Sequence, residues 1–417
     1  MEFVDLSNSR SFARGFPHDF FTWLRHNEPV WWHEPTRFTP NGVGFWVVSR
    51  YDDVVAVFKD AETFSSELGG TQIYDGKGMG YQLNQTDDPK HRRLRALVNK
   101  GFTPRMIGLL EDELRTRTKR ILDNVPLAET FNLVPAVARE LPLQAICSVL
   151  GVPQEDRTEI VEIVDLAIGA GDGTVMSPQY LKRLGAYADA VVERKRSDPA
   201  NDILSVIVHA QLDDGSPQLN NLELRAFFNL LFPAGAETTR GSIAGGLLAL
   251  IENPDQLERL RNNPELMKSA IEEIVRWTSP SVYKRRTAAC DTELRGHSIR
   301  KGQKVTVWEM SANRDEDVFE NAFRFDVGRD PNYHVGFGLG THFCLGANLA
   351  RLEIRVMFEE MLDRFERFEL MGPLAWTNNN RLLSLTELPV RVSLKKGPAH
   401  SNNPRPAQSA SNARAKM

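Results

Sequence analysis

The segment Phe337-Gly-Leu-Gly-Thr-His-Phe-Cys-Leu-Gly346 places a cysteine after a glycine-rich loop and directly before an apolar-periodic stretch. A helix with one buried face is predicted over about residues 345–365, because apolar residues recur there at helical spacing; these are Leu345, Leu349, Leu352 and Val356. At the start of such a helix, unpaired amides and the positive end of the dipole favour a thiolate at Cys344. The loop glycines let the backbone approach a flat ligand without a Cβ clash; they are Gly338, Gly340 and Gly346. A metal-bound thiolate needs these features.

The other two cysteines lack such surroundings. Cys147 lies in an apolar helical run, and Cys290 lies in Thr-Ala-Ala-Cys-Asp, with neither a glycine loop nor a helix start. We therefore predict ordinary structural roles for both. Three widely spaced cysteines do not form a disulfide framework, which favours a reducing compartment.

A long apolar helix is predicted from about Asn221 to Glu252, with a stop signal at Asn253-Pro254. Its middle reads Ala234-Gly-Ala-Glu-Thr-Thr239. An acid and two hydroxyls are costly inside an apolar helix unless they have a use. A mid-helix threonine can bond back to a carbonyl one turn earlier and open the helix locally, which makes a polar notch for oxygen and water. Pro233 lacks an N–H and is expected to sharpen this kink.

Two charged pairs are spaced to share a helix face. Glu273 and Arg276 are three residues apart, and pairs of this kind are common on protein surfaces. His91 and Arg95 are four residues apart, in a helix that is predicted to start at Asp88-Pro89. By itself this second pair is more typical of a solvated basic helix face.

Composition excludes several classes of protein. The chain has 417 residues, of which 41% are hydrophobic and 25% charged, as in ordinary globular proteins. The net charge of −4 gives no strongly basic field, so we expect no nucleic-acid partner. The N-terminus has no basic and apolar run, and no stretch approaches about 18 uncharged apolar residues, so we expect no signal peptide, membrane anchor or membrane span. A cytoplasmic location is predicted.

The elements read along the chain predict a mainly α fold. Helical patterns dominate from about Lys90 to Phe232, and residues 66–85 read as a long loop. A smaller β-rich region is expected from the strand-like runs; they start at Gly44, Arg285, His297, Lys304 and Leu388. We find no internal linker or repeat, so residues 1–396 are predicted to form a single domain. Residues 397–417 lack apolar side chains to bury and are predicted to be a disordered tail.

These motifs together resemble the cytochrome P450 family. The pattern Phe337-x-x-Gly340-x-His342-x-Cys344-x-Gly346 resembles its haem-binding signature, and Ala234–Thr239 resembles its oxygen-activation motif. Glu273-x-x-Arg276 resembles the buried charged pair of the family core. The order and spacing of the motifs agree over about residues 15 to 393, and the long helix would be the family's central oxygen-activating helix.

The resemblance implies a role for each motif. Cys344 would bind the iron of haem b as a thiolate within a cofactor site that includes Phe337 and Gly346. The haem propionates would be held by His91, Arg95, Arg286 and His342. Thr238 would donate a hydrogen bond to bound oxygen and Glu237 would feed in protons. Glu273 and Arg276 would act structurally, with Arg329 as a third member. Ala234, Val282 and Leu385 are expected to line the substrate pocket.

The implied activity is that of a monooxygenase that inserts one atom of O2 into a C–H bond. The chain has no flavin, nicotinamide or iron–sulfur motif, so electrons would come from a ferredoxin and a ferredoxin reductase. A basic docking patch is expected at Lys90, Arg92, Arg93, Lys100 and Arg351.

The 308–314 segment and the Glu-Thr-Thr-Arg run resemble bacterial members that oxidise sterols, terpenoids or branched lipids. We expect a monomer. Two alternatives stay open: a peroxide-dependent enzyme of the same fold, which the Glu237–Thr238 pair disfavours, and a non-catalytic haem-thiolate binder or sensor, for which no appended signalling domain is found.

Overall fold

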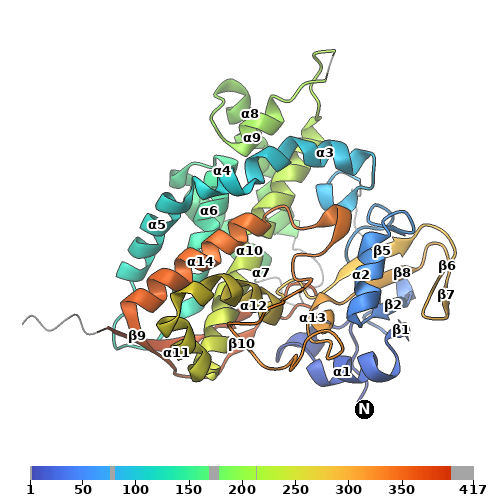
Figure 1. Cartoon of the computed structure of the whole chain (residues 1–417). Coiled ribbons are helices and arrows are strands. Elements are labelled where there is room, and N and C mark those ends of the chain that lie inside the picture. Colours follow the sequence, from blue (N-terminus) through green and yellow to red (C-terminus); the bar gives the residue numbers. More distant parts are fainter. Residues whose placement is uncertain (1, 76–79, 169–177, 213, 396–417) are drawn as a thin grey trace, which may run out of the picture.

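Helices form most of the chain and a smaller β-rich region flanks them, as the sequence predicts (Figure 1). The computed structural model describes residues 2–75, 80–168, 178–212 and 214–395. The predicted tail, residues 397–417, lies outside the described residues. The prediction of a single domain over residues 1–396 stays a prediction.

Fourteen α-helices are described in this part of the chain. They are α1 (His18–Asn27), α2 (Tyr51–Lys59), α3 (Lys90–Asn99), α4 (Pro104–Gly108), α5 (Glu111–Asp123), α6 (Glu140–Leu150), α7 (Arg157–Ile168), α8 (Pro178–Ser197), α9 (Ile203–Val208), α10 (Asn221–Glu252), α11 (Pro254–Asn262), α12 (Met267–Thr278), α13 (Glu309–Ala312) and α14 (Ala347–Arg364). The largest hydrophobic core lies among these helices, where α10 packs against α6, α8, α12 and α14.

The strands of the described residues form four small sheets. The largest has the order β1-β2-β8-β5-β3, in which β2 and β8 are parallel and the other neighbours antiparallel. The others pair β4-β12-β9, β10-β11 and β6-β7. The strands are β1 (Val30–His33), β2 (Phe45–Val48), β3 (Phe64–Ser65), β4 (Phe131–Asn132), β5 (Lys284–Ala288), β6 (Thr292–Leu294), β7 (His297–Ile299), β8 (Lys304–Val307), β9 (Phe365–Leu370), β10 (Ala375–Trp376), β11 (Leu385–Glu387) and β12 (Pro389–Leu394).

The long central helix α10 has the bounds that the sequence predicts. At its start, the Asn220 side chain accepts a hydrogen bond from the Glu223 amide at 3.0 Å, and the Glu223 carboxylate accepts one from the Asn220 amide at 3.1 Å. This capping box satisfies two amides that the helix itself cannot pair. At its end, Pro254 begins α11 and cannot continue α10. Strong local signals therefore fixed both ends of this helix.

The loop between β3 and α3 was also predicted from the sequence. Beyond Ser65 its described residues contain only a short 3-10 turn, Leu83–Gln85, while residues 76–79 are not described. Buried Arg285 of β5 donates hydrogen bonds to the Gly69 and Gln72 carbonyls at 2.9 and 3.1 Å and pairs with Asp75. A sheet residue thus anchors the first half of this loop.

Candidate active site

Cys344 lies at the end of the glycine-rich loop, immediately before α14. Its backbone amide donates to the Phe337 carbonyl at 2.8 Å, which closes the loop on itself. Gly338 and Gly340 both have a φ of 66°, and a Cβ on Gly340 would lie 2.7 Å from the carbonyl oxygen of Phe58. These two positions therefore require glycine for the backbone itself. The helix begins at Ala347, two residues later than predicted, with Gly346 as its N-cap.

The ionisation of Cys344 differs from the expectation. Burial raises the pKa of its thiol, although the Gly346 amide and the charges of Lys284 and Arg95 act in the opposite direction. The helix start therefore does not favour a thiolate in the protein alone, because the desolvation of the sulfur outweighs the neighbouring dipoles. Metal binding displaces the proton of a coordinating thiol, and the buried sulfur then needs the metal as its counter-charge.

Four basic side chains gather beside this loop from three separate parts of the chain. The rings of His91, on α3, and His342 lie 4.2 Å apart between their centroids. Burial, together with the charges of Arg286, His91 and Arg95, lowers the pKa of His342 to about 2. Burial likewise lowers the pKa of Arg286, on β5, to about 10. These four residues, His91, Arg95, Arg286 and His342, form what we call the basic cradle.

The basic cradle holds more positive charge than its protein neighbours match. Within the described residues, no carboxylate lies within ion-pair distance of Arg95, Arg286 or His342, and His91 has only Asp88 at 3.5 Å. Neither buried ring nitrogen of His91 has a hydrogen-bond partner in this part of the chain. Buried charges and polar groups without partners are costly, so the cradle has the chemistry of an anion site.

The central helix α10 carries the acid and the alcohol of its motif in the turn that follows Pro233, where the helix is continuous. The Thr238 hydroxyl donates to the Ala234 carbonyl at 2.7 Å, the back-bond that bends helices. Glu237 is ion-paired with Arg240 at 2.7 Å. Ala234 is exposed, whereas Phe232 and Ala236 on the same helix are buried, so the protein does not cover α10 at Ala234.

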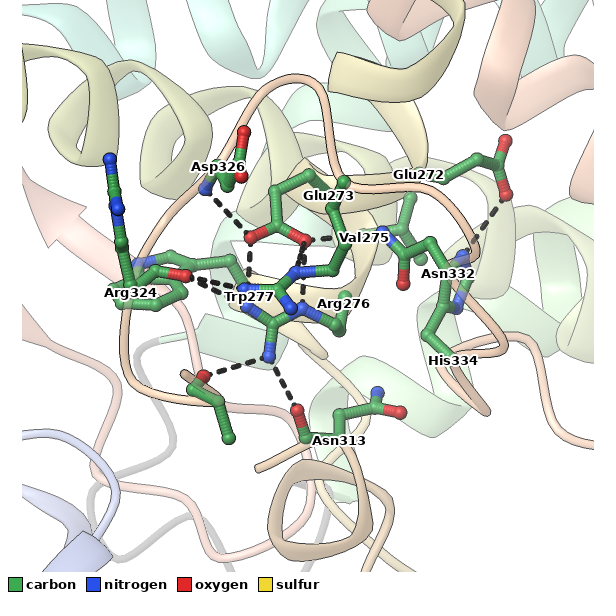
Figure 2. A network of polar contacts seen from close by, with 12 residues as sticks. Glu272, Glu273, Val275, Arg276, Trp277, Asn313, Arg324, Asp326, Asn332 and His334 are labelled. Atoms are coloured by element: carbon green, nitrogen blue, oxygen red, sulfur yellow. Dashed lines mark hydrogen bonds and ion pairs between the residues drawn. The ribbon is translucent and has the colours of Figure 1, made fainter. Parts of the chain in front are cut away.

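Glu273 and Arg276 lie in the core and not on the surface. Both side chains are fully buried, and the Arg276 Nε lies 2.7 Å from the Glu273 carboxylate (Figure 2). Arg329 adds a second contact to the same carboxylate at 3.1 Å. Arg276 also donates to the carbonyls of Asn313 and Ala322 at 2.6 and 2.9 Å. The network therefore ties α12 to the segment that leads into the cysteine loop.

The three expected pocket residues do not share one environment. Ala234 is exposed, whereas Val282 and Leu385 are 0% and 1% exposed and pack inside two different hydrophobic cores. In this structure neither of these two side chains faces an open space, because the surrounding core residues cover both. Their expected place at the substrate pocket stays a prediction.

The expected basic docking patch is largely neutralised by nearby acids. Arg351 makes a bidentate contact with Glu272 at 2.7 and 2.8 Å, and Arg92 pairs with Asp88 at 3.0 Å. Lys90 and Arg93 lie 3.7 and 3.8 Å from Glu223. The side chain of Lys100 is outside the described residues. Arg92 is the most exposed of the described side chains in this patch, with 81% of its surface accessible to solvent.

Several charged contacts near the site were not predicted. The Glu272 carboxylate lies 3.0 Å from the His334 ring nitrogen (Figure 2), in addition to its contact with Arg351. The Arg351 guanidinium also lies 4.5 Å from the ring centre of Phe337. Arg240 joins Glu237 to Ser384, which is 144 residues away in the sequence. The sequence signal for Arg240 was its spacing of three from Glu237, but helical spacing alone does not reveal the distant partner.

Comparisons with known proteins show the family of the chain. A family model, cytochrome P450, matches residues 178–394. The chain is 49% identical over 402 residues to cytochrome P450 126 of Mycobacterium tuberculosis, covering 93% of this chain and 97% of that protein. The chain belongs to the cytochrome P450 family.

Two further relatives show how the P450 fold and activity extend to this chain. It is 38% identical over 385 residues to the steroid C26-monooxygenase of Rhodococcus jostii, covering 89% of this chain and 81% of that protein. The crystal structure of a Mycobacterium marinum P450 in complex with pseudoionone superposes with a TM-score of 0.85 at 34% identity, covering 94% of this chain and 98% of that one. The chain therefore has the P450 fold and is a P450 monooxygenase. No helix among the described residues is long and apolar enough to cross a membrane.

P450s use haem with a cysteine thiolate ligand, and the residues of this chain fit that group. Cys344 supplies a half-buried sulfur that accepts a hydrogen bond from the Gly346 amide. The basic cradle supplies cationic and imidazole donors for two carboxylates at a fixed spacing, which is what haem propionates require. Among the described residues, the His91 ring nitrogens have no hydrogen-bond partner and the buried Arg286 has no carboxylate partner, so both are suited to binding the propionates.

Proposed function

We propose that this P450 hydroxylates a hydrophobic terpenoid, steroid or methyl-branched lipid, with electrons supplied by an external ferredoxin and ferredoxin reductase. The observation that carries the proposal is the joint presence of the Cys344 loop, the basic cradle and the Glu237–Thr238 turn, next to the exposed Ala234. The steroid relative and the pseudoionone-bound neighbour support the substrate class. A cytoplasmic location and a monomeric state stay predictions.

Each group of residues has a separate task. Haem held through Cys344 supplies the activation of O2 and the insertion of one oxygen atom into a C–H bond. The basic cradle fixes the orientation of the cofactor, and the Gly346 amide donates toward the sulfur and stabilises its negative charge. On the central helix, the Thr238 hydroxyl proton is held on the Ala234 carbonyl in this structure, so its donation toward a ligand requires rotation about χ1. Glu237 moves protons into the same turn.

The cofactor assignment is tested by the absorption spectrum of the reduced, carbon-monoxide-bound protein. Wild type should show the long-wavelength band of a thiolate ligand, and Cys344→Ser should lose it. Cys290→Ser is the matched control, since this exposed thiol is distant in sequence from the loop, and it should keep the band. Absence of the band in wild type would overturn the haem-thiolate assignment.

The substrate class is tested by spin-state titration with pseudoionone, testosterone and a methyl-branched fatty acid. At least one compound should shift the Soret band and then yield a product that carries one atom from ¹⁸O-labelled O2. Turnover should need NADH, ferredoxin and the reductase. If hydrogen peroxide alone supported faster turnover than this system, the peroxide-dependent alternative would replace the proposal.

Docking of the ferredoxin is tested at Arg92, the most exposed member of the expected patch. Arg92→Glu should slow reduction of the haem by ferredoxin at low salt, and this difference should shrink as salt is added. Arg300→Glu, on a distant β-turn, is a control for the change of net charge. An equal effect of the two variants would count against the α3 patch.

A further inference from the structure

Arg240 is a buried cation placed between the acid of the oxygen-activation motif and a distant loop. Its Nη2 lies 2.7 Å from the Glu237 carboxylate and 3.0 Å from the Ser384 hydroxyl. Only 3% of the Arg240 side chain is exposed, against 15% for Glu237. A buried guanidinium needs a counter-charge, and its planar fork fixes the direction of the groups that it binds.

Ser384, the second residue that Arg240 contacts, is itself held by two hydrogen bonds to Thr377. The Ser384 amide donates to the Thr377 hydroxyl at 3.1 Å, and the Ser384 carbonyl accepts from the Thr377 amide at 2.8 Å. Next to Arg240, a Cβ on Gly241 would lie 3.0 Å from the Cβ atoms of both Pro280 and Ser384. The missing side chain at Gly241 therefore lets α10 approach the 384 segment closely enough for the Arg240–Ser384 contact.

A second polar side chain, from α8, lies near Glu237. Tyr180, on α8, is 1% exposed, and burial together with the Glu237 charge raises the pKa of its phenol to about 12. The carboxylate therefore has a neutral phenol and a buried guanidinium among its neighbours. Of these two, only the guanidinium carries a charge that can hold the carboxylate in place.

We propose that Arg240 is the positioning residue of Glu237: it keeps the carboxylate in one orientation beside Thr238, and Ser384 fixes Arg240 in turn. This inference rests on the proposed role of Glu237 in moving protons. Arg240 itself is not a catalytic residue, since it acts through Glu237. Its removal should misplace the carboxylate without changing the cofactor ligand.

The fate of O2 without any substrate reports on this positioning. Two-electron reduction consumes one NADH and one proton per O2 and gives hydrogen peroxide. Four-electron reduction consumes two NADH and two protons per O2, breaks the O–O bond and gives two water molecules. Cleavage of the O–O bond requires protons to reach the bound oxygen. A misplaced Glu237 carboxylate therefore shifts the products from water toward hydrogen peroxide.

The experiment uses the haem-loaded full chain with plant-type ferredoxin, its reductase and NADPH or NADH, and it measures reductant consumed and peroxide formed per O2. Arg240→Lys keeps the charge but loses the fork, and it should lower the rate of water formation by about tenfold. Glu237→Gln removes the proton-carrying group and should lower it by about a hundredfold, the lower end of what positioned proton transfer contributes. Ser384→Ala should change the balance in the same direction as Arg240→Lys, by less.

Two controls separate positioning from loss of fold. Arg25→Lys alters an equally buried arginine, which pairs with Glu316 at 3.0 Å outside the site, and it should leave the water-to-peroxide balance unchanged. Binding of 4-phenylimidazole and the carbon-monoxide spectrum should match wild type in Arg240→Lys. In a double-variant cycle on thermal unfolding, Arg240→Met should destabilise much less when Glu237→Gln is already present.

The decisive comparison is Arg240→Lys in the Glu237→Gln background. If Arg240 acts through Glu237, the second change should leave the water-to-peroxide balance of Glu237→Gln unaltered. A further tenfold loss there, or a wild-type balance in the Arg240→Lys single variant, would overturn the inference. A missing thiolate band in wild type would instead overturn the proposed function, so the two failures are distinguishable.

Discussion

Replacing Glu273 with glutamine should destabilise the protein severely although the side-chain shape is retained. The carboxylate accepts contacts from Arg276 at 2.7 and 2.8 Å, the Asp326 amide at 2.9 Å, and Arg329 and Asn332 both at 3.1 Å (Figure 2). Glutamine keeps one acceptor oxygen, so it leaves two buried arginines without a counter-charge. Breaking a buried ion pair on one side costs about 3–5 kcal/mol.

That loss is a large part of the whole stability of a folded protein, which is about 5–15 kcal/mol. We expect the free energy of unfolding, measured by urea titration with circular dichroism, to fall by at least about 3 kcal/mol. The matched control is Glu162→Gln, which breaks the surface pair with Arg183 at 3.0 Å, and it should cost about 1 kcal/mol or less. A loss below about 1 kcal/mol for Glu273→Gln would refute the assignment of the network as a main support of the core.

The same variant has a pH dependence with a definite sign. Burial opposes ionisation of Glu273, but the hydrogen bonds and charge of Arg276 outweigh it, and the pKa of the carboxyl is lowered. The stabilisation by Glu273 is therefore present above the ordinary glutamate pKa and is lost as the pH falls through the lowered value. The stability gap between wild type and Glu273→Gln should shrink on acidification through that range.

Three other predictions concern single sites. Gly340→Ala should cut haem incorporation because its Cβ would meet a backbone carbonyl at 2.7 Å and its φ is 66°, whereas Gly108→Ala, with no atom within 4 Å, should leave the reduced carbon-monoxide spectrum intact. Burial and the charges of Arg314 and Arg25 lower the pKa of His18 to about 3, so the free energy of unfolding should fall as the pH drops from about 6.5 toward 3, and His18→Phe should flatten that fall; an equally steep profile in the variant would contradict this. Burial raises the pKa of Glu353 well above its usual range, so wild-type stability should decline as the pH rises above about 4.5, and Glu353→Gln should raise the melting temperature at pH 7; a lower melting temperature would refute it.

Much of the site was predictable because its signals are local. The cysteine loop, the glycines with positive φ and the helix that follows lie within about thirty residues. The ends of α10 follow from a capping box and a proline, each decided within one turn of helix. The two-residue strand β4 was missed, because so short a strand has no periodicity to detect.

These local signals do not predict which residues that are far apart in the sequence come into contact. Arg351 was expected on an open basic patch, but folding places Glu272 of α12 against it. Arg240 and Ser384 are 144 residues apart in the sequence, but folding brings their side chains into hydrogen-bond contact. In each case the outcome depends on which surfaces of distant elements meet, and helical or strand periodicity carries no information on that.

The sequence by itself determined that Cys344 stands at the end of a glycine-rich loop, before a helix with one buried face. Only the tertiary structure decided the electrostatics there: burial raises the pKa of the thiol, and Arg95 of α3 and Arg286 of β5 bring positive charge beside it. The physical reason is that desolvation and charge act through space. A residue's neighbours along the chain determine its backbone conformation, whereas the packing of the whole fold determines its dielectric surroundings and its partners.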